Sequence, residues 1–159
     1  MTGRISPLQE AQRPALARLG PLAEWALKVF QELSTMSKQY RGTREYALIF
    51  AELLTAARYR GTVTYQELAE LVGLPLQGNF MGAELGEYLG AISEDEVQRG
   101  RPMLSAIAVT TTGKPGGGFL PWARQLGRLT SDDPGVQQAF WEAEKKAVLA
   151  TWQRSFAKV

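Results

Sequence analysis

Apolar residues recur every three or four positions along most of this chain, which is the spacing of amphipathic helices. The spacing predicts a helix from Pro21 to about Ser37 and a second from about Thr43 to Tyr59. The second helix is apolar over much of its circumference, so we expect it to lie centrally. Further helices are predicted from about Phe80 to Ile92, over 119–126, and from Val136 to about Phe156.

A short helix from Tyr65 to Val72 is marked at both ends. Thr64 and Glu67 have the spacing of a capping box, in which each side chain accepts a hydrogen bond from the other residue's backbone N–H. Gly73 is the expected end of this helix, and Pro75 lies just beyond it.

The best strand candidate is Met103 to Thr112, where two sets of side chains alternate. The glycine-rich run 113–118 that follows is expected to form a turn or loop. Taken with the helices, this pattern predicts a mainly α fold with a small β element.

Several faces of the predicted helices have a structural interpretation. Three glycines at four-residue spacing give the helix that begins near Phe80 a smooth stripe, which favours close helix packing. The four tryptophans fall on apolar faces and are expected in the core. Glu94, Asp95 and Glu96 are expected to form a solvated helix end. The glycines are Gly82, Gly86 and Gly90, and the tryptophans are Trp25, Trp122, Trp141 and Trp152.

The composition narrows the chemistry. The 159 residues include no cysteine and no histidine, which excludes disulfides, thiolate nucleophiles, imidazole bases and Cys or His metal ligands. A chain without cysteine fits a cytoplasmic protein. No stretch approaches the about 20 apolar residues of a membrane span. Residues 1–20 contain three arginines and no continuous apolar block, so we expect no signal peptide there.

The net charge of +2 hides an uneven distribution. Residues 1–77 carry a net +2, residues 78–96 carry −5 with no basic side chain, and residues 97–159 carry +5. A basic face is therefore possible in the C-terminal part, but it cannot be centred on 78–96.

The segment from Gly61 to Pro75, GTVTYQELAELVGLP, resembles the start of the DNA-binding domain of the alkylguanine-DNA alkyltransferases and the alkyltransferase-like proteins. The spacing between Val63 and Tyr65 is one residue tighter than in that family. Residues 104–109 and 112–118 are similar to the family's reactive strand and glycine-rich wing. Over roughly 43–120, the resemblance implies a winged helix-turn-helix centred on 61–118, within a single α-rich domain of 21–159 that follows a flexible lead-in of 1–20.

The departures from the family concern its chemistry. The reactive cysteine would fall at Ser105 and the family's histidine at Ala106, so we expect no alkyl transfer, no catalytic residue and no cofactor. The alkyltransferase-like proteins also lack the cysteine and still bind damaged DNA. The resemblance therefore implies a non-enzymatic DNA-binding protein that acts in DNA-damage recognition or repair.

The candidate site residues follow from the resemblance and from the charges. Tyr65 matches the tyrosine that presses on the target nucleotide, or is a half-buried residue of a first helical turn. Asn79 and Phe80 begin the expected recognition helix, or are an N-cap followed by a core anchor. The cationic residues and the glycine-rich turn would bind phosphates, or the turn is simply mobile. The full set is Tyr65, Asn79, Phe80, Arg99, Arg101, Ser105, Lys114 and Arg124.

Two functions other than DNA binding remain open. The first is an interaction module, which binds a basic protein through 78–96 or a small anion near Arg101 and Lys114. The stretch from Asn79 to Ile92 has two glutamates and no basic residue, which favours this module. The second is a metal-dependent hydrolase that uses Glu94 or Glu96.

Overall fold

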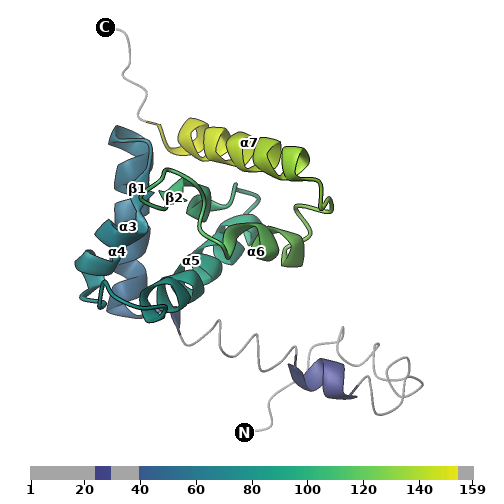
Figure 1. The fold of residues 1–159 in the computed structure, drawn as a ribbon, viewed down its shortest axis with the longest axis horizontal. Helices are drawn as coiled ribbons and strands as arrows, with labels where there is room; N and C mark the ends of the chain where they lie inside the picture. Colours follow the sequence, from purple (N-terminus) through teal and green to yellow (C-terminus); the bar gives the residue numbers. More distant parts are fainter. Residues whose placement is uncertain (1–23, 30–39, 154–159) are drawn as a thin grey trace, which may run out of the picture. The chain divides into compact units, whose positions relative to one another are not determined.

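The computed structural model describes residues 24–29 and 40–153 (Figure 1). The chain divides into two compact units, 1–36 and 37–159, which we treat separately. In the first unit, 24–29 are helical and lie within the predicted helix of 21–37. The rest of that helix and the lead-in of 1–20 lie outside the described residues. The predicted end of the last helix near Phe156 is wrong, because that helix stops at Trp152 and Gln153 is its C-cap.

The second unit is mainly helical with a small β element, as the sequence predicted (Figure 1). α3 contacts α4, α5, α7 and the short 3-10 helix η1, which confirms that it lies centrally. In chain order, the elements are α3 (Arg44–Tyr59), β1 (Val63–Thr64), α4 (Tyr65–Val72), α5 (Phe80–Gln98), η1 (Leu104–Ile107), β2 (Ala108–Val109), α6 (Phe119–Gln125) and α7 (Pro134–Trp152).

The predicted helix ends are confirmed in α3 and α4. The Thr43 hydroxyl accepts the first-turn N–H of Tyr46. At α4, the Thr64 hydroxyl accepts the Glu67 N–H and the Glu67 carboxylate accepts the Thr64 N–H, which completes the capping box. Gly73 ends α4 with φ +73°, a conformation that glycine adopts without the strain of a Cβ. These local signals needed no tertiary contact to be recognised.

The β element is smaller than predicted. β1 and β2 pair in parallel, with Val63 opposite Ala108 and Thr64 opposite Val109. A single antiparallel bridge between Val109 and Pro115 closes the turn that follows. The winged arrangement stays a prediction, because this small parallel pair does not establish it.

The strand predicted from Met103 to Thr112 is wrong over most of its length. Residues 104–107 form η1, in which the Ala106 N–H donates to the Met103 carbonyl at 3.0 Å, and only 108–109 are extended. Every residue from 103 to 109 is buried. The alternation therefore did not separate an inner face from a solvated one, and that separation is what makes alternation diagnostic of a strand.

α5 is longer than predicted and runs on from Ile92 to Gln98. Glu94, Asp95 and Glu96 consequently lie within the helix, and the solvated helix end expected for them is wrong. Arg41 donates to Glu94 at 2.7 Å and to Asp95 at 2.8 Å. Charged residues from outside the helix thus compensate these acids.

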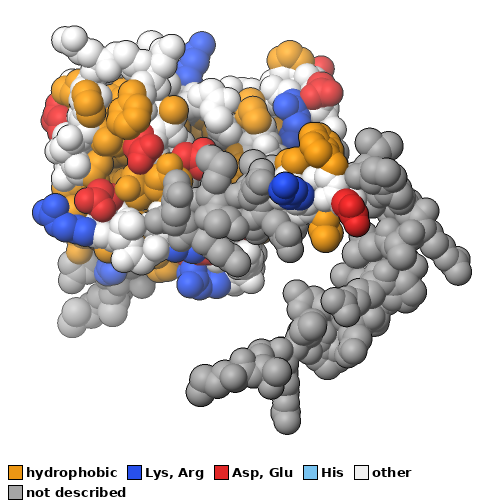
Figure 2. Space-filling view, turned by 90° about the horizontal axis from the view of Figure 1, so that it is seen from below, with side chains coloured by type: hydrophobic (Ala, Val, Ile, Leu, Met, Phe, Trp, Pro, Cys, Tyr) orange, Lys and Arg blue, Asp and Glu red, His pale blue; other side chains and the backbone are white. Residues whose placement is uncertain are grey.

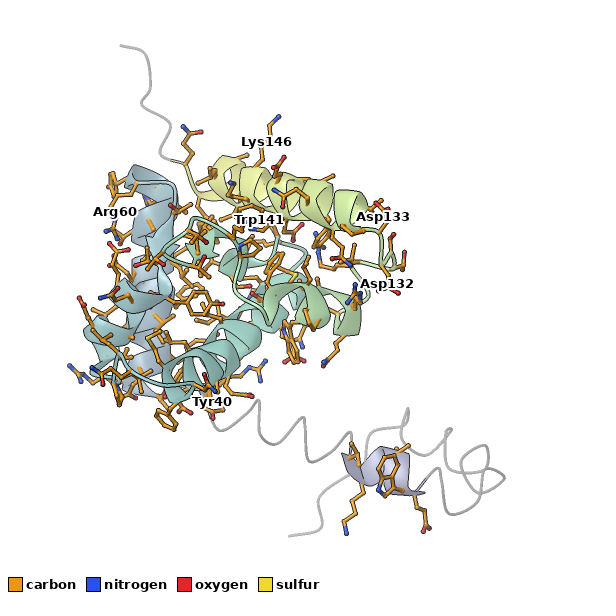
Figure 3. The ribbon with its side chains drawn as sticks, viewed as in Figure 1. Tyr40, Arg60, Asp132, Asp133, Trp141 and Lys146 are labelled. Atoms are coloured by element: carbon orange, nitrogen blue, oxygen red, sulfur yellow. The ribbon has the colours of Figure 1, made fainter. Side chains whose placement is uncertain are left out.

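The tryptophans are only partly core residues. Trp141 is buried and points inward from α7, whereas Lys146 of the same helix points outward (Figure 3). Trp122 and Trp152 are half-buried against the core. Trp25, in the first unit, is 66% exposed, so the core position expected for it is wrong.

Of the three glycines in the α5 stripe, only Gly90 packs against another helix. The indole N–H of Trp122 donates to the Gly90 carbonyl at 3.0 Å, and a Cβ on Gly90 would lie 3.4 Å from that ring. A Cβ on Gly82 or Gly86 would meet no atom within 4 Å. Close packing is therefore wrong for Gly82 and Gly86, which lie under open space.

This difference predicts unequal gains in stability along one stripe. Gly82→Ala and Gly86→Ala are each expected to raise the free energy of unfolding by about 0.5 to 1 kcal/mol, because alanine loses less backbone entropy in a helix. Gly90→Ala is expected to gain less, since its methyl group meets the Trp122 ring. Urea unfolding followed by circular dichroism measures all three, and a loss of stability at Gly82 would contradict the open surface.

Candidate functional site

Ser105, at the position of the family's reactive cysteine, is buried inside the second unit. The Ser93 hydroxyl donates to the Ser105 hydroxyl at 2.7 Å, and the Ser105 N–H donates back to the Ser93 oxygen at 3.2 Å. Next along the chain, the Ala106 carbonyl accepts the Trp141 indole N–H at 2.9 Å. These bonds fix η1 between α5 and α7 and leave Ser105 in the interior.

Two buried carboxylates hold the same segment. Glu96 is 0% exposed and accepts two hydrogen bonds from the Arg101 guanidinium, at 2.6 and 2.7 Å. Glu144 accepts the Met103 N–H at 2.7 Å and an Arg128 N–H at 2.9 Å. We call this set the polar belt: Ser93, Glu96, Arg101, Ser105, Arg128, Trp141 and Glu144.

The polar belt changes the interpretation of Arg101. The expectation was a phosphate clamp, but its guanidinium is committed to Glu96 and lies over the Trp152 ring at 5.2 Å. The hydrogen bonds to Glu96 raise the pKa of Arg101. Arg99 is more exposed and lies 3.8 Å from Glu96. Sequence reasoning missed Glu144, because its partners are about 40 and 16 residues away in the chain.

The other two candidate cations lie on the surface in different settings. Arg124 pairs with the exposed Asp132 at 2.7 Å, which reduces its net attraction for a phosphate. Asp132 lies in the loop before α7 (Figure 3). Lys114 is exposed in the turn that the Thr110 N–H closes by donating to the Lys114 carbonyl at 2.8 Å. The four cations therefore do not share one uncompensated surface.

Tyr65 is half-buried in the first turn of α4, against the glycine-rich turn. A Cβ on Gly116 would lie 2.8 Å from Cε2 of the Tyr65 ring, so only glycine fits there without displacement. Burial raises the pKa of the Tyr65 hydroxyl. This packing agrees with the structural interpretation of Tyr65, and a role in DNA binding stays a prediction.

The start of α5 lies on the surface. Asn79 precedes the helix, but its side chain makes no capping hydrogen bond. Phe80 is 58% exposed, so the core-anchor alternative for Phe80 is wrong. A polar residue and an exposed aromatic residue thus open this helix, in a position to contact a partner.

Other apolar and acidic residues close to this point in the chain also reach the surface. Leu71 at the end of α4 is 40% exposed, and Leu76 in the loop is 43% exposed. Glu84 and Glu87 follow Phe80 along α5. We call Leu71, Leu76, Phe80, Glu84 and Glu87 the α4–α5 face. Seen from below, hydrophobic side chains with acidic side chains among them cover much of the described surface, and Lys and Arg lie toward its edges (Figure 2).

The charge around the α4–α5 face is one-sided. Residues 61–98 contain seven acidic side chains and no Lys or Arg. Over the whole of 40–153 there are 11 basic and 13 acidic residues, a net charge of −2, so the +2 of the chain arises at its ends. Sequence reasoning did not identify Leu71 and Leu76. The 38-residue gap between basic residues was the signal that pointed to this region.

The acidic residues do not form a metal centre in the described part of the chain. Within it, no three Asp or Glu side chains are grouped so that they could hold a metal ion. Asp95 instead accepts a hydrogen bond from the Tyr46 hydroxyl as well as from Arg41. Burial, followed by the bond to Asp95, raises the pKa of Tyr46. The cluster therefore joins α3 to α5.

Comparisons with protein-family models, with curated proteins and with solved structures found no match to this chain. The alkyltransferase-like resemblance therefore stays a prediction. No helix in 24–29 or 40–153 is both long enough and apolar enough to cross a lipid bilayer.

Proposed function

We propose that this chain is a non-enzymatic binding module that recognises a protein partner and keeps a helix-turn-helix-like core. One observation carries the proposal: the exposed start of α5 presents Phe80, Glu84 and Glu87 in a stretch without any Lys or Arg. A helix that reads DNA needs basic or amide side chains directed at phosphates and bases. An acidic and aromatic helix face suits a protein surface better.

The absence of catalysis is part of the proposal, and the polar belt supports it. The Ser105 hydroxyl is paired with Ser93 and buried, and the chain has no imidazole to activate it. The described carboxylates of the polar belt, Glu96 and Glu144, are paired with Arg101 and Arg128. The proposal keeps the cytoplasmic location expected from a chain without cysteine.

DNA binding is the second candidate, and the exposed turn at Lys114 favours it. Lys114 and Gly117 are exposed there, and the residues outside 40–153 add seven basic and three acidic side chains. Such binding would use the turn and the chain ends rather than α5. Because phosphate contacts release counterions, the affinity would fall steeply with salt.

The test compares the two candidates on the full chain. We expect selection of a displayed random-peptide library on the immobilised protein to enrich peptides rich in Lys and Arg. We expect gel shifts with duplex and single-stranded DNA at about 50 mM salt to be weak. Lys146→Ala, on the outer side of α7, is the matched control for Lys114→Ala.

The opposite pattern would overturn protein recognition. It consists of no enriched peptide, together with a DNA shift that weakens strongly between about 50 and 200 mM salt. Loss of that shift in Lys114→Ala, but not in Lys146→Ala, would assign DNA binding to the turn.

A further inference from the structure

We infer that the α4–α5 face binds a basic amphipathic helix of a partner protein, an inference that rests on the proposed function and names the partner's chemistry. The apolar positions supply the anchor, and the glutamates select Lys and Arg. Each of these features comes from a different property of the described residues.

The apolar anchor is a local concentration of exposed side chains. Five large hydrophobic residues of 40–153 are exposed, and three of them, Leu71, Leu76 and Phe80, fall within ten residues. The other two are Tyr59 and Val136. Single exposed hydrophobic residues are ordinary on protein surfaces, whereas a cluster with a polar rim marks an interaction site. Phe80 is the largest of the three and the natural hot spot.

One side of α5 faces outward and can contact a partner. Phe80, Ala83, Glu84 and Glu87 have the i, i+3, i+4, i+7 spacing of one helical face, and none of them is buried. Gly82 and Gly86 lie about 160° and 120° around the helix from Phe80, so they belong to another side of α5. The contacts that α5 offers at this face therefore come from Phe80 and the two glutamates.

The charge of the face selects a basic partner. Glu84 and Glu87 have no Lys or Arg nitrogen within 4.0 Å among the described residues, unlike Glu94, Asp95 and Glu96. Lys and Arg of a partner would neutralise these carboxylates, while nucleic acid or an acidic peptide would be repelled. The pairing sets specificity and association rate more than affinity.

A partner helix fits better than a partner strand. Strand addition needs an accessible sheet edge with unpaired backbone groups. In the described residues, β1 and β2 have two residues each, and Val63, Ala108 and Val109 are buried. The exposed surface is instead the side of a helix, so helix-on-helix docking is the mode that it offers.

The experiment uses a labelled peptide of about 18 residues, five helical turns, with Leu on one face and Lys on its flanks. Its binding to the full chain is followed by fluorescence anisotropy. Phe80→Ala and the double variant Glu84→Lys/Glu87→Lys are each expected to weaken binding about tenfold. Val136→Ala and Glu142→Lys, at exposed positions of α7, are the matched controls and should stay within about twofold.

Three outcomes would overturn the inference: no binding of the peptide, equal binding of a peptide with the same residues in scrambled order, or equal weakening by the α7 controls. Unchanged melting temperatures of the variants establish that a loss of binding is not a loss of folding. The peptide-display selection decides the proposed function independently. Peptides enriched there that still bind the Phe80→Ala variant would support protein recognition but contradict the α4–α5 face as its binding site.

Discussion

Arg101→Met lowers the free energy of unfolding by about 3 kcal/mol, because it leaves the fully buried Glu96 carboxylate without its guanidinium partner. Methionine retains the aliphatic volume, so the main change is the loss of charge and of two hydrogen bonds. Urea unfolding with the slope m held equal to that of the wild type measures the effect.

The control is Arg99→Met, because Arg99 is more exposed and lies 3.8 Å from the same carboxylate. It is expected to change stability by no more than about 0.5 kcal/mol. The double variant Arg101→Met/Glu96→Leu is expected to recover much of the loss, since it removes the stranded charge. Equal small effects of Arg101→Met and Arg99→Met would contradict the structural role and return Arg101 to the candidate phosphate contacts.

Glu144→Ala is expected to cost about 2 to 3 kcal/mol, the second-largest effect. The substitution leaves the N–H of the buried Met103, the residue just before η1, without an acceptor and opens a small cavity beneath α7. It also removes the partner of Arg128. The measurement is again urea unfolding, and the near-ultraviolet circular dichroism of Trp141 reports on packing at the same place.

Glu144→Gln separates the hydrogen bond from the Met103 N–H from the ion pair with Arg128. The amide oxygen can still accept the Met103 N–H, so this variant is expected to lose less stability than Glu144→Ala. Glu142→Ala, on the exposed part of the same helix, is the matched control and should be nearly neutral. If Glu144→Ala were as mild as Glu142→Ala, the hydrogen bond from α7 to η1 would not contribute measurably to the fold.

The polar belt and the α4–α5 face together define what the proposed module can offer a partner. The belt engages Arg101 and Arg128 in ion pairs, and ion pairs engage six of the eleven basic side chains of 40–153 in all, which lowers the positive charge available to nucleic acid. The face presents exposed apolar side chains and the carboxylates of Glu84 and Glu87, which form no ion pair with a described Lys or Arg. The same segregation of charge therefore supports both the stability predictions and the proposed partner.

The candidate site was harder to predict than the fold, for reasons that particular residues illustrate. The resemblance directed attention to Tyr65, Phe80 and Ser105 and assigned them to one DNA surface. Ser105 is buried and hydrogen-bonded to Ser93 of α5, and the Tyr65 ring packs against Gly116. The charge distribution likewise led to the expectation that Arg101 can bind a phosphate, although its guanidinium is hydrogen-bonded to the buried Glu96 carboxylate.

The sequence by itself determined α3 and α4 with their ends, and the positions of α5 and α6, because caps and amphipathic spacing act within a few residues. Thr43, Thr64, Glu67 and Gly73 behave as their local chemistry requires. Only the tertiary structure decided the rest: that 104–107 turns instead of extending, that Glu96 and Glu144 are interior, and that Phe80 is exposed. Burial and pairing depend on which distant segments pack together, and no local pattern contains that information.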